Sequence, residues 1–449
     1  MKWFRINLLL IQMVVFSQVP LLAQIPWTLD QCINYAWENN FQVHSQEIGV
    51  KIRKTDYKQA MNELYPSLIF QTSYDQYFGR SIDPSTNSYI DVKFFNNSYG
   101  LSTSVDLFNG FMKLNTISMQ RLNFEAEKSK LQQVRNEVAF TVINSYFNVL
   151  LQLGLSEIAN ENFQLSRSQL DFTTKFVELG RKPGTDLLET EATLASDSFL
   201  LVQSYNLLDQ AMLGLKYQMN YTLTDSLTID TLVPSIFAGS IDTLSMEELF
   251  NVASSALPDI SYARNILLAA KKEVQVSKGA FSPRLGFYAG WNSQYMETNR
   301  DSLDRIIPFS NQISNNSNEY LGFGLEIPLF SRFSKNTSLS KSKLRYQQAK
   351  FQYDDISYKL MMGVEKSLTE WRAARAEYES SLSQLAKNLK AYEAAEKKLD
   401  NGLINIIEFY IQKNKWIGAK TEVLRTGLQV LLKERYIRFL MTGTLLSGK

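Results

Sequence analysis

The chain has 449 residues, with 47 lysines and arginines against 45 aspartates and glutamates, one histidine and one cysteine. The balanced charge argues against a strongly basic nucleic-acid-binding face. A single cysteine, Cys32, excludes an internal disulfide, and a single histidine, His44, excludes a histidine-rich metal site. The usual general base is nearly absent, and phosphate-loop, nucleophile-elbow and HExxH motifs are missing. We therefore predict that the protein is not an enzyme and that it has no catalytic, cofactor-binding or metal site.

The first residues have the pattern of an export signal. Lys2 and Arg5 precede a short apolar run at 6–16, and Ala23 ends a plausible cleavage site. The apolar run is too short to span a bilayer. We predict that 1–23 is a signal peptide and that the mature protein leaves the cytoplasm.

The rest of the chain repeats itself. The segment 66–70 (PSLIF) is echoed by 283–287 (PRLGF), an offset of 283 − 66 = 217, and 107–108 (LF) by 329–330, an offset of 329 − 107 = 222. The change of offset places an insertion in a loop between the two segments. A duplication of this length predicts two structurally equivalent repeats, at 24–243 and 244–449.

Each repeat carries two segments with period-two alternation, at about 66–78 and 97–108 and at about 283–295 and 319–330. Segments that are apolar on one face and small or polar on the other are typical of transmembrane barrel strands. The apolar face is predicted to contain Leu68, Phe70, Leu101, Leu285, Phe287, Phe323 and Leu325, and an aromatic girdle to contain Tyr77, Phe78, Phe94, Phe95 and Tyr295. A soluble hairpin packed on a core gives the same alternation.

Long helices follow the strands. No proline lies between Pro84 and Pro183 or after Pro328, and these stretches are rich in good helix formers. We predict long helices at 110–178 and 333–400, return helices at 185–220 and 406–442, and a linker at 221–243 that forms an equatorial belt.

Two apolar stripes run along the first long helix at three- and four-residue steps. One contains Val134, Val138, Val142 and Tyr146, and the other contains Ile143, Phe147 and Ile158. Two adjacent stripes favour a helix with a neighbour on each side, as in a cylinder of helices. An extended antiparallel coiled-coil rod has the same periodicity and stays open at this point.

Four strands cannot close a transmembrane barrel, because an open edge leaves backbone groups unsatisfied in lipid. The protomers must therefore pool their strands. A homotrimer gives twelve strands, and its long helices give a matching helical cylinder.

The order of these motifs resembles the TolC-like outer-membrane efflux proteins of Gram-negative bacteria. The resemblance rests on the opening Trp27-Thr28-Leu29, the paired Pro-x-Leu-x-Phe strands, the segments 106–110 (DLFNG) and 327–330 (IPLF), and the glycine turns at Gly180 and Gly402. One departure is Ser331-Arg332, where the family has a glycine-rich step between the last strand and its helix. A second is Arg181-Lys182, where the family has small apolar residues.

The resemblance implies a mainly α protein with a membrane β-barrel portion: a trimeric twelve-stranded outer-membrane barrel continued by a long periplasmic α-barrel. It also implies a passive exit duct for a tripartite efflux or type I secretion system. The implied partners are a periplasmic adaptor, an inner-membrane RND or ABC transporter and outer-membrane lipid, with no nucleic acid. The alternative is a periplasmic coiled-coil scaffold or adaptor-like protein without a pore.

The predicted gate and adaptor rim lies at the two glycine turns. By resemblance, Asp186 and Glu408 match acids near a constricted tip, and three subunits repeat each acid as a ring that favours cations. Glu189 is a third such acid, and Arg181 and Lys182 are placed to pair with these carboxylates across a subunit interface. Helix N-terminal acids that interact only with the helix dipole are the alternative, worth about 0.3–1 kcal/mol each. The predicted site is Gly180, Arg181, Lys182, Asp186, Glu189, Gly402 and Glu408.

Overall fold

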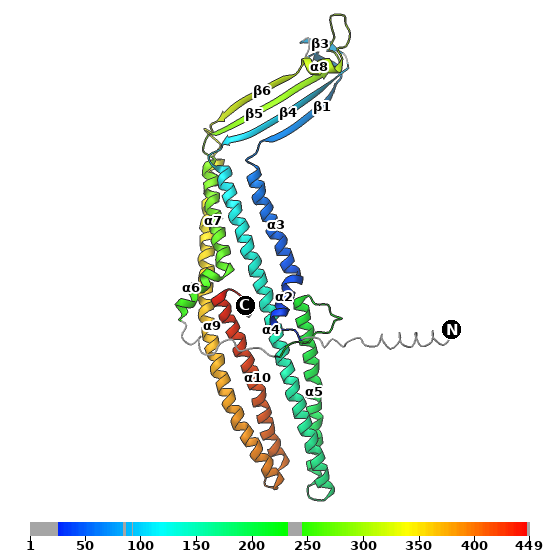
Figure 1. Ribbon diagram of the computed structural model, residues 1–449, viewed down its shortest axis with the longest axis vertical. Helices are drawn as coiled ribbons and strands as arrows, with labels where there is room; N and C mark the ends of the chain where they lie inside the picture. The colour runs from blue at the N-terminus through cyan, green and yellow to red at the C-terminus, as the bar shows by residue number, and fades with distance from the viewer. Residues whose placement is uncertain (1–25, 84–86, 92, 232–244, 447–449) are drawn as a thin grey trace, which may run out of the picture. The chain divides into compact units, whose positions relative to one another are not determined.

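The computed structural model describes residues 26–83, 87–91, 93–231 and 245–446. The predicted signal peptide and most of the second half of the predicted linker lie outside these ranges. In chain order the elements are α2 (Leu29–Asn39), α3 (Phe41–Asn62), β1 (Ser67–Tyr77), β2 (Arg80–Asp83), β3 (Ser88–Asp91), β4 (Phe94–Phe108), α4 (Met112–Glu178), α5 (Gly184–Met219), α6 (Met246–Ala256), α7 (Pro258–Gly279), β5 (Arg284–Met296), α8 (Phe309–Asn315), β6 (Asn318–Glu326), α9 (Ser334–Asp400) and α10 (Ile406–Thr442) (Figure 1).

The loops between paired strands contain structure that the sequence pattern does not predict: the small β2–β3 hairpin and the helix α8. The last strand is also shorter than predicted, because β6 ends at Glu326 rather than near residue 330. Pro328 follows and has no amide hydrogen to donate to a sheet.

The chain forms two compact units, and each combines segments of both sequence repeats. The helical unit contains Met1–His44, Val134–Ala253 and Gly363–Lys449. The sheet unit contains Ser45–Gln133 and Ser254–Met362.

In the sheet unit, four antiparallel strands lie in the order β1-β4-β5-β6 (Figure 1). The two hairpins have the same register. Gln71 pairs with Gly100 in the first, and Tyr288 pairs with Gly322 in the second. These residues are related by the sequence offsets, since 288 − 71 = 217 and 322 − 100 = 222. The duplication seen in the sequence therefore extends to individual strand pairs.

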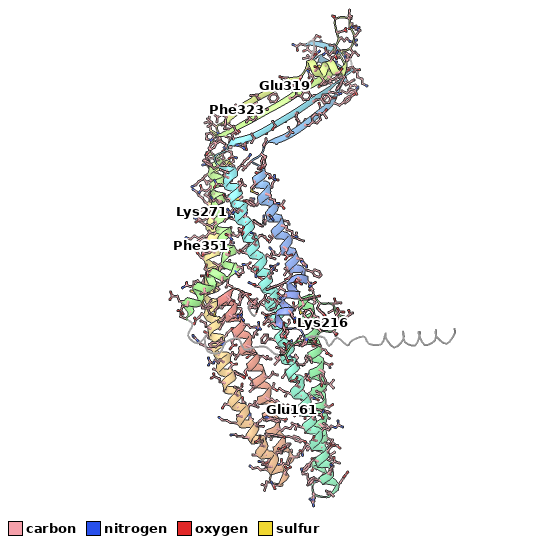
Figure 2. All side chains as sticks on the ribbon, in the orientation of Figure 1. Glu161, Lys216, Lys271, Glu319, Phe323 and Phe351 are labelled. Atoms are coloured by element: carbon pink, nitrogen blue, oxygen red, sulfur yellow. The ribbon has the colours of Figure 1, made fainter. Side chains whose placement is uncertain are left out.

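The register places the predicted apolar residues on one face of the sheet, here called the apolar face. Phe70 lies opposite Leu101, Phe287 opposite Phe323, and Leu285 opposite Leu325, with side chains alternating between faces along each strand. Phe323 is 65% exposed within the single chain (Figure 2). A broad exposed apolar face of this kind must be covered by another apolar environment.

The aromatic girdle differs in part from the prediction. On the apolar face, the ring centroid of Phe95 lies 5.4 Å from that of Tyr74 and 5.7 Å from that of Tyr295, which contacts Phe309 of α8 at 5.5 Å. Tyr77 and Phe94 do not belong to this cluster. They pair with each other in the register and stack at 4.9 Å on the opposite face, because their positions have the other parity.

The first long helix forms the core of the helical unit. Val138, Val142 and Tyr146 of one stripe and Ile143 and Phe147 of the other are all buried. The helix α4 therefore has neighbours on both sides, as its two stripes predict. By length and composition α4 is the one described helix that could cross a membrane, and 44% of its most apolar stretch is buried within the chain.

The opening helix α2 begins with a capping box, in which Thr28 accepts a hydrogen bond from the backbone of Gln31 and the Gln31 side chain accepts one from the backbone of Thr28. It buries Cys32 and Ile33 completely. Burial raises the pKa of the Cys32 thiol to about 12. Cys32 is thus an uncharged core thiol.

The turn from strand to long helix is the same in both repeats, although only one contains glycine. Gly110 and Phe111 have φ values of 64° and 60°, and Arg332 and Phe333 have 50° and 60°. The ring pairs Phe108–Phe111 and Phe330–Phe333 both meet edge to face at 5.5 Å. Thus the bend forms at Arg332 without the family's glycine-rich step, at the cost of left-handed backbone at a side-chain-bearing residue.

We expect Arg332→Gly to stabilise the protein by about 1 kcal/mol, because glycine adopts φ > 0 without steric cost. The measurement is the temperature at which detergent-extracted oligomers dissociate on gels. Gly110→Ala is the matched contrast, since a Cβ there would lie 2.4 Å from the Gly279 carbonyl oxygen. Equal effects of the two variants would contradict the assignment of strain to Arg332.

Candidate functional site

The predicted gate residues lie in the turns of two helical hairpins of the helical unit. In the α4–α5 turn, Gly180 has φ 66°, and the amides of Arg181 and Lys182 both donate to the Phe176 carbonyl, at 2.8 and 3.2 Å. This glycine-terminated geometry closes the last turn of α4 and reverses the chain. The neighbouring Leu179 is 68% exposed.

The α9–α10 turn has the same design. Gly402 has φ 70°, and the amide of Leu403 donates to the Lys398 carbonyl at 2.8 Å. Leu403 is 73% exposed. Each hairpin therefore presents a hydrogen-bonded turn with an exposed leucine beside the glycine.

Glu408 has a local structural role. The Glu408 amide donates to Asn405 Oδ1 at 2.8 Å, and Asn405 Nδ2 donates to Glu408 Oε1 at 3.1 Å. These reciprocal bonds cap the start of α10. Its exposed carboxylate still adds a negative charge to the turn.

Asp186 and Glu189 lie in the first two turns of α5. Asp186 is half-buried and its carbonyl accepts a 2.7 Å bond from the Thr190 hydroxyl, whereas Glu189 is exposed. Both acids occupy the helix end at which negative charge is favoured.

The two basic residues of the first turn behave differently from each other. Arg181 is exposed. The Lys182 ammonium lies 5.3 Å from the centre of the Phe172 ring, and its nitrogen is buried with no hydrogen-bond partner among the described residues. Within one chain, then, Lys182 binds an aromatic face rather than a carboxylate.

A buried polar cluster, which the sequence analysis did not predict, joins α10 to the α4–α5 hairpin. Lys413 of α10 is 2% exposed and its Nζ lies 3.2 Å from Asp197 Oδ2 of α5. Ser166 of α4 donates to the same Asp197 oxygen and accepts from Lys413, and Asn162 Nδ2 donates to Asp197 Oδ1 at 2.7 Å. Burial lowers the pKa of Lys413, and the charge of Asp197 opposes that shift.

The α9–α10 hairpin end also has apolar support. The α9–α10 end packs around a cluster of Tyr392, Leu399, Ile406 and Phe409, with Trp416 stacked on Tyr392 at 4.7 Å. Burial raises the pKa of Tyr392 to about 12, so the hydroxyl stays protonated and donates to Glu396 at 3.2 Å.

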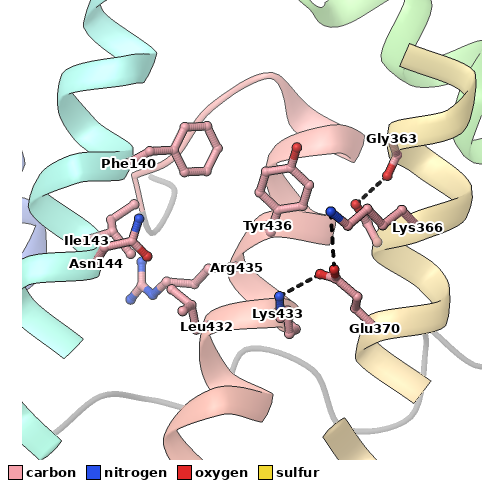
Figure 3. Close-up of a pocket in the computed structure, with 11 residues that line it drawn as sticks. Phe140, Ile143, Asn144, Gly363, Lys366, Glu370, Leu432, Lys433, Arg435 and Tyr436 are labelled. Atoms are coloured by element: carbon pink, nitrogen blue, oxygen red, sulfur yellow. Dashed lines mark hydrogen bonds and ion pairs between the residues drawn. The ribbon is translucent and has the colours of Figure 1, made fainter. Parts of the chain in front are cut away.

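A separate cavity of about 360 Å³ lies among α4, α9 and α10 (Figure 3). On its wall, Glu370 of α9 accepts a 2.6 Å bond from Lys433 of α10, and Lys366 lies 3.7 Å from the other carboxylate oxygen. The Lys433 hydrogen bond holds the pKa of Glu370 below its usual value. This ion triad braces α9 against α10. Among the residues that the structure describes, no group of His, Cys, Asp or Glu is placed to hold a metal ion.

An open antiparallel sheet with an apolar face, joined to long helices in paired hairpins, defines a subunit of an oligomeric outer-membrane channel. The model of the outer membrane efflux protein family matches residues 32–219 and 249–443, one stretch in each predicted repeat. The chain belongs to this family. It is an outer-membrane channel-tunnel that extends into the periplasm and serves as an exit duct in efflux or secretion.

Known proteins agree with this assignment. The chain is 20% identical to the outer membrane efflux protein BepC of Brucella suis over 84% of this chain and 75% of that protein. It is 22% identical to the cation efflux system protein CusC of Escherichia coli O157:H7 over 87% and 81%. The crystal structure of the Campylobacter jejuni CmeC outer membrane channel aligns with a TM-score of 0.79 at 16% identity, over 94% of this chain and 87% of that one.

The fold of these channels confirms the predicted architecture: three chains form a β-barrel of pooled strands and an α-barrel of long helices. The prediction of an outer-membrane exit duct is likewise confirmed at the level of the family.

We expect Lys413→Met to destabilise the helical unit by about 3–5 kcal/mol, because it leaves the buried Asp197 carboxylate without its counter-charge. The double variant Lys413→Met/Asp197→Leu should recover most of this loss, since both charges are then removed together. Chemical denaturation followed by circular dichroism measures both. If the double variant is as unstable as the sum of the single variants, the two groups do not act as a pair.

Proposed function

We propose that the two hairpin turns form the gate and the adaptor-docking rim of a passive duct. The observation that carries this proposal is that both turns contain a glycine with positive φ and expose a leucine, Leu179 or Leu403. Exposed apolar side chains within a polar rim are typical of protein docking sites. The partner is a periplasmic adaptor, which connects the duct to an inner-membrane transporter of the RND or ABC class.

The acids of the turns supply charge selectivity. In a trimer, Asp186 and Glu408 each occur three times around the bore, and Glu189 adds a third set. Rings of carboxylates favour cations in a narrow pore. The capping bonds of Glu408 fix the position of its carboxylate, which supports its role as a fixed charge.

The basic residues hold the closed state. Lys182 lies over Phe172 within its own chain, and this cation–π contact immobilises the ammonium at the turn. To pair with a carboxylate of the neighbouring chain, the ammonium turns away from Phe172, while the exposed Arg181 contributes to the choice of adaptor.

The apolar face of the sheet contacts lipid. The edge strand β6 of one chain pairs with β1 of the next, and this closes the barrel. The same pairing brings the helix after β6, α9, against the helix before β1, α3. Exposed apolar residues lie along both helices: Leu344, Phe351 and Tyr358 on α9 and Ile48 and Ile52 on α3. Figure 2 labels Phe351.

The chain organisation follows the duplication. A signal peptide at 1–23 precedes two structural repeats at 24–243 and 244–449, joined by a linker at 221–243 that contributes to an equatorial belt. The equal register of the two hairpins and the two separate family matches support this division.

We expect Phe287→Arg to reduce barrel assembly, since an arginine on the lipid face near the bilayer midplane costs about 2–4 kcal/mol. Asn292→Arg, on the opposite face of the same strand, is the matched control and should assemble normally. The yield of heat-modifiable trimer in outer-membrane fractions is the measurement. The reverse result would assign the lipid to the other face.

We expect Asp186→Asn/Glu408→Gln to lose cation preference in planar bilayers, measured as the reversal potential in a salt gradient. Glutamine retains the capping bonds at position 408, so only charge changes. Lys182→Ala should raise single-channel conductance because the closed state loses its cation. Unchanged selectivity and conductance would assign these residues to helix capping alone.

A further inference from the structure

Two tyrosines lie on the sheet face opposite the apolar face, here called the polar face. Tyr288 of β5 and Tyr320 of β6 have 44% and 42% of their surface exposed, and their ring centroids are 6.3 Å apart. The register pairs Tyr288 with Gly322 and Tyr320 with Gly290. Each ring therefore stands opposite a residue without a side chain.

The glycines let the rings lie against the sheet. A Cβ at Gly322 would be 2.8 Å from Cζ of Tyr288, and a Cβ at Gly290 would be 2.6 Å from Cζ of Tyr320. No side chain could occupy those positions without moving the rings. Each tyrosine covers a glycine with one ring face and leaves the other face open.

The hairpin itself does not require this arrangement. In the first repeat, the equivalent of Tyr288 and Gly322 is the pair Gln71 and Gly100, and the equivalent of Gly290 and Tyr320 is the pair Ser73 and Ser98. The two serine hydroxyls meet at 2.7 Å. The same register therefore forms with small polar residues, and the aromatic pair is particular to the second repeat.

The cross-strand neighbours of the two rings on β4 are small and uncharged. Ser104 lies opposite Tyr288 on β4, and Ser102 lies opposite Gly290. Asp106, further along β4 on the same face, forms an ion pair with Lys113 at 3.0 Å. Two open ring faces among small hydroxyl and glycine residues can bind a flat apolar group while leaving its polar substituents in water.

We propose that Tyr288 and Tyr320 form a stacking site for the aromatic ring of a solute passing through the barrel. The site rests on the proposed orientation of the sheet, in which the polar face lines the lumen. A trimer has three such sites, separated by first-repeat hairpins that carry no ring at the equivalent positions Gln71 and Ser98. Binding is weak, since one pair of exposed rings contacts only one face of the solute, and weak binding suits a site from which solute must leave.

The test uses detergent-solubilised full-length trimers and two monovalent cations, benzyltrimethylammonium and the ring-free tetramethylammonium. Saturation-transfer NMR reports bound probe without requiring an open channel. We expect transfer to the benzyl ring protons and none to tetramethylammonium. Tyr288→Ala/Tyr320→Ala should reduce the transfer severalfold, whereas Tyr288→Phe/Tyr320→Phe should retain it because the ring face binds.

The first repeat provides matched controls. Gln71→Ala/Ser98→Ala changes the equivalent positions and should leave the transfer unchanged. Gln71→Tyr/Ser73→Gly/Ser98→Tyr copies the aromatic pair into the first repeat. This variant should raise the saturation transfer about twofold, because it doubles the number of stacking sites in the trimer.

The proposal is overturned if the alanine pair binds the benzyl probe as the wild type does, if the phenylalanine pair loses binding, or if tetramethylammonium shows equal transfer. Should the alanine pair fail to assemble, the phenylalanine and transplanted variants decide the outcome. A trimer that binds the probe but shows no current in bilayers would contradict the duct and not the stacking site.

Discussion

The hydrogen bonds missing from the two edges of the sheet require this protein to associate with other copies of itself in the membrane. Within the sheet, β1 and β6 are each paired on one side only. In lipid, each unpaired amide or carbonyl costs several kcal/mol, so four strands cannot remain alone in a membrane. The pooling of strands between chains and the closure of the barrel both follow from this single requirement.

The helices, unlike the sheet, have no unpaired backbone edges. Their backbone is paired within each helix, so side chains alone decide how hairpins associate. The apolar stripes on α4 supply most of the free energy of association. Hydrophobic contacts are non-directional, so they do not fix how the helices are aligned. The Lys413–Asp197 pair adds direction, because its hydrogen bonds to Ser166 and Asn162 are formed in one alignment of three helices. The pair therefore selects an alignment more than it adds net stability.

Much of this structure could be predicted from the sequence, and the exceptions have physical causes. Sequence periodicity predicted the strands and helices, because each face of a strand or helix contacts the same environment over many residues. The Tyr77–Phe94 pair was assigned to the wrong face, since a single residue of register decides the side. Lys413 was not predicted, because no sequence pattern distinguishes this buried lysine from the exposed Lys415 two residues later. The bend at Arg332 shows that a missing glycine changes strain and not topology.

The equal register of the two hairpins has a consequence for the junction between subunits. A ring of duplicated hairpins approximates six-fold symmetry, in which the β6–β1 junction between chains is equivalent to the β4–β5 junction within a chain. In β4–β5, Leu101 lies opposite Trp291. For the proposed β6–β1 pairing, shifting each residue by its offset, 101 + 222 = 323 and 291 − 217 = 74, predicts that Phe323 lies opposite Tyr74 of the partner subunit. On that pairing, each chain would contain an internal copy of the contact that it makes with its neighbour.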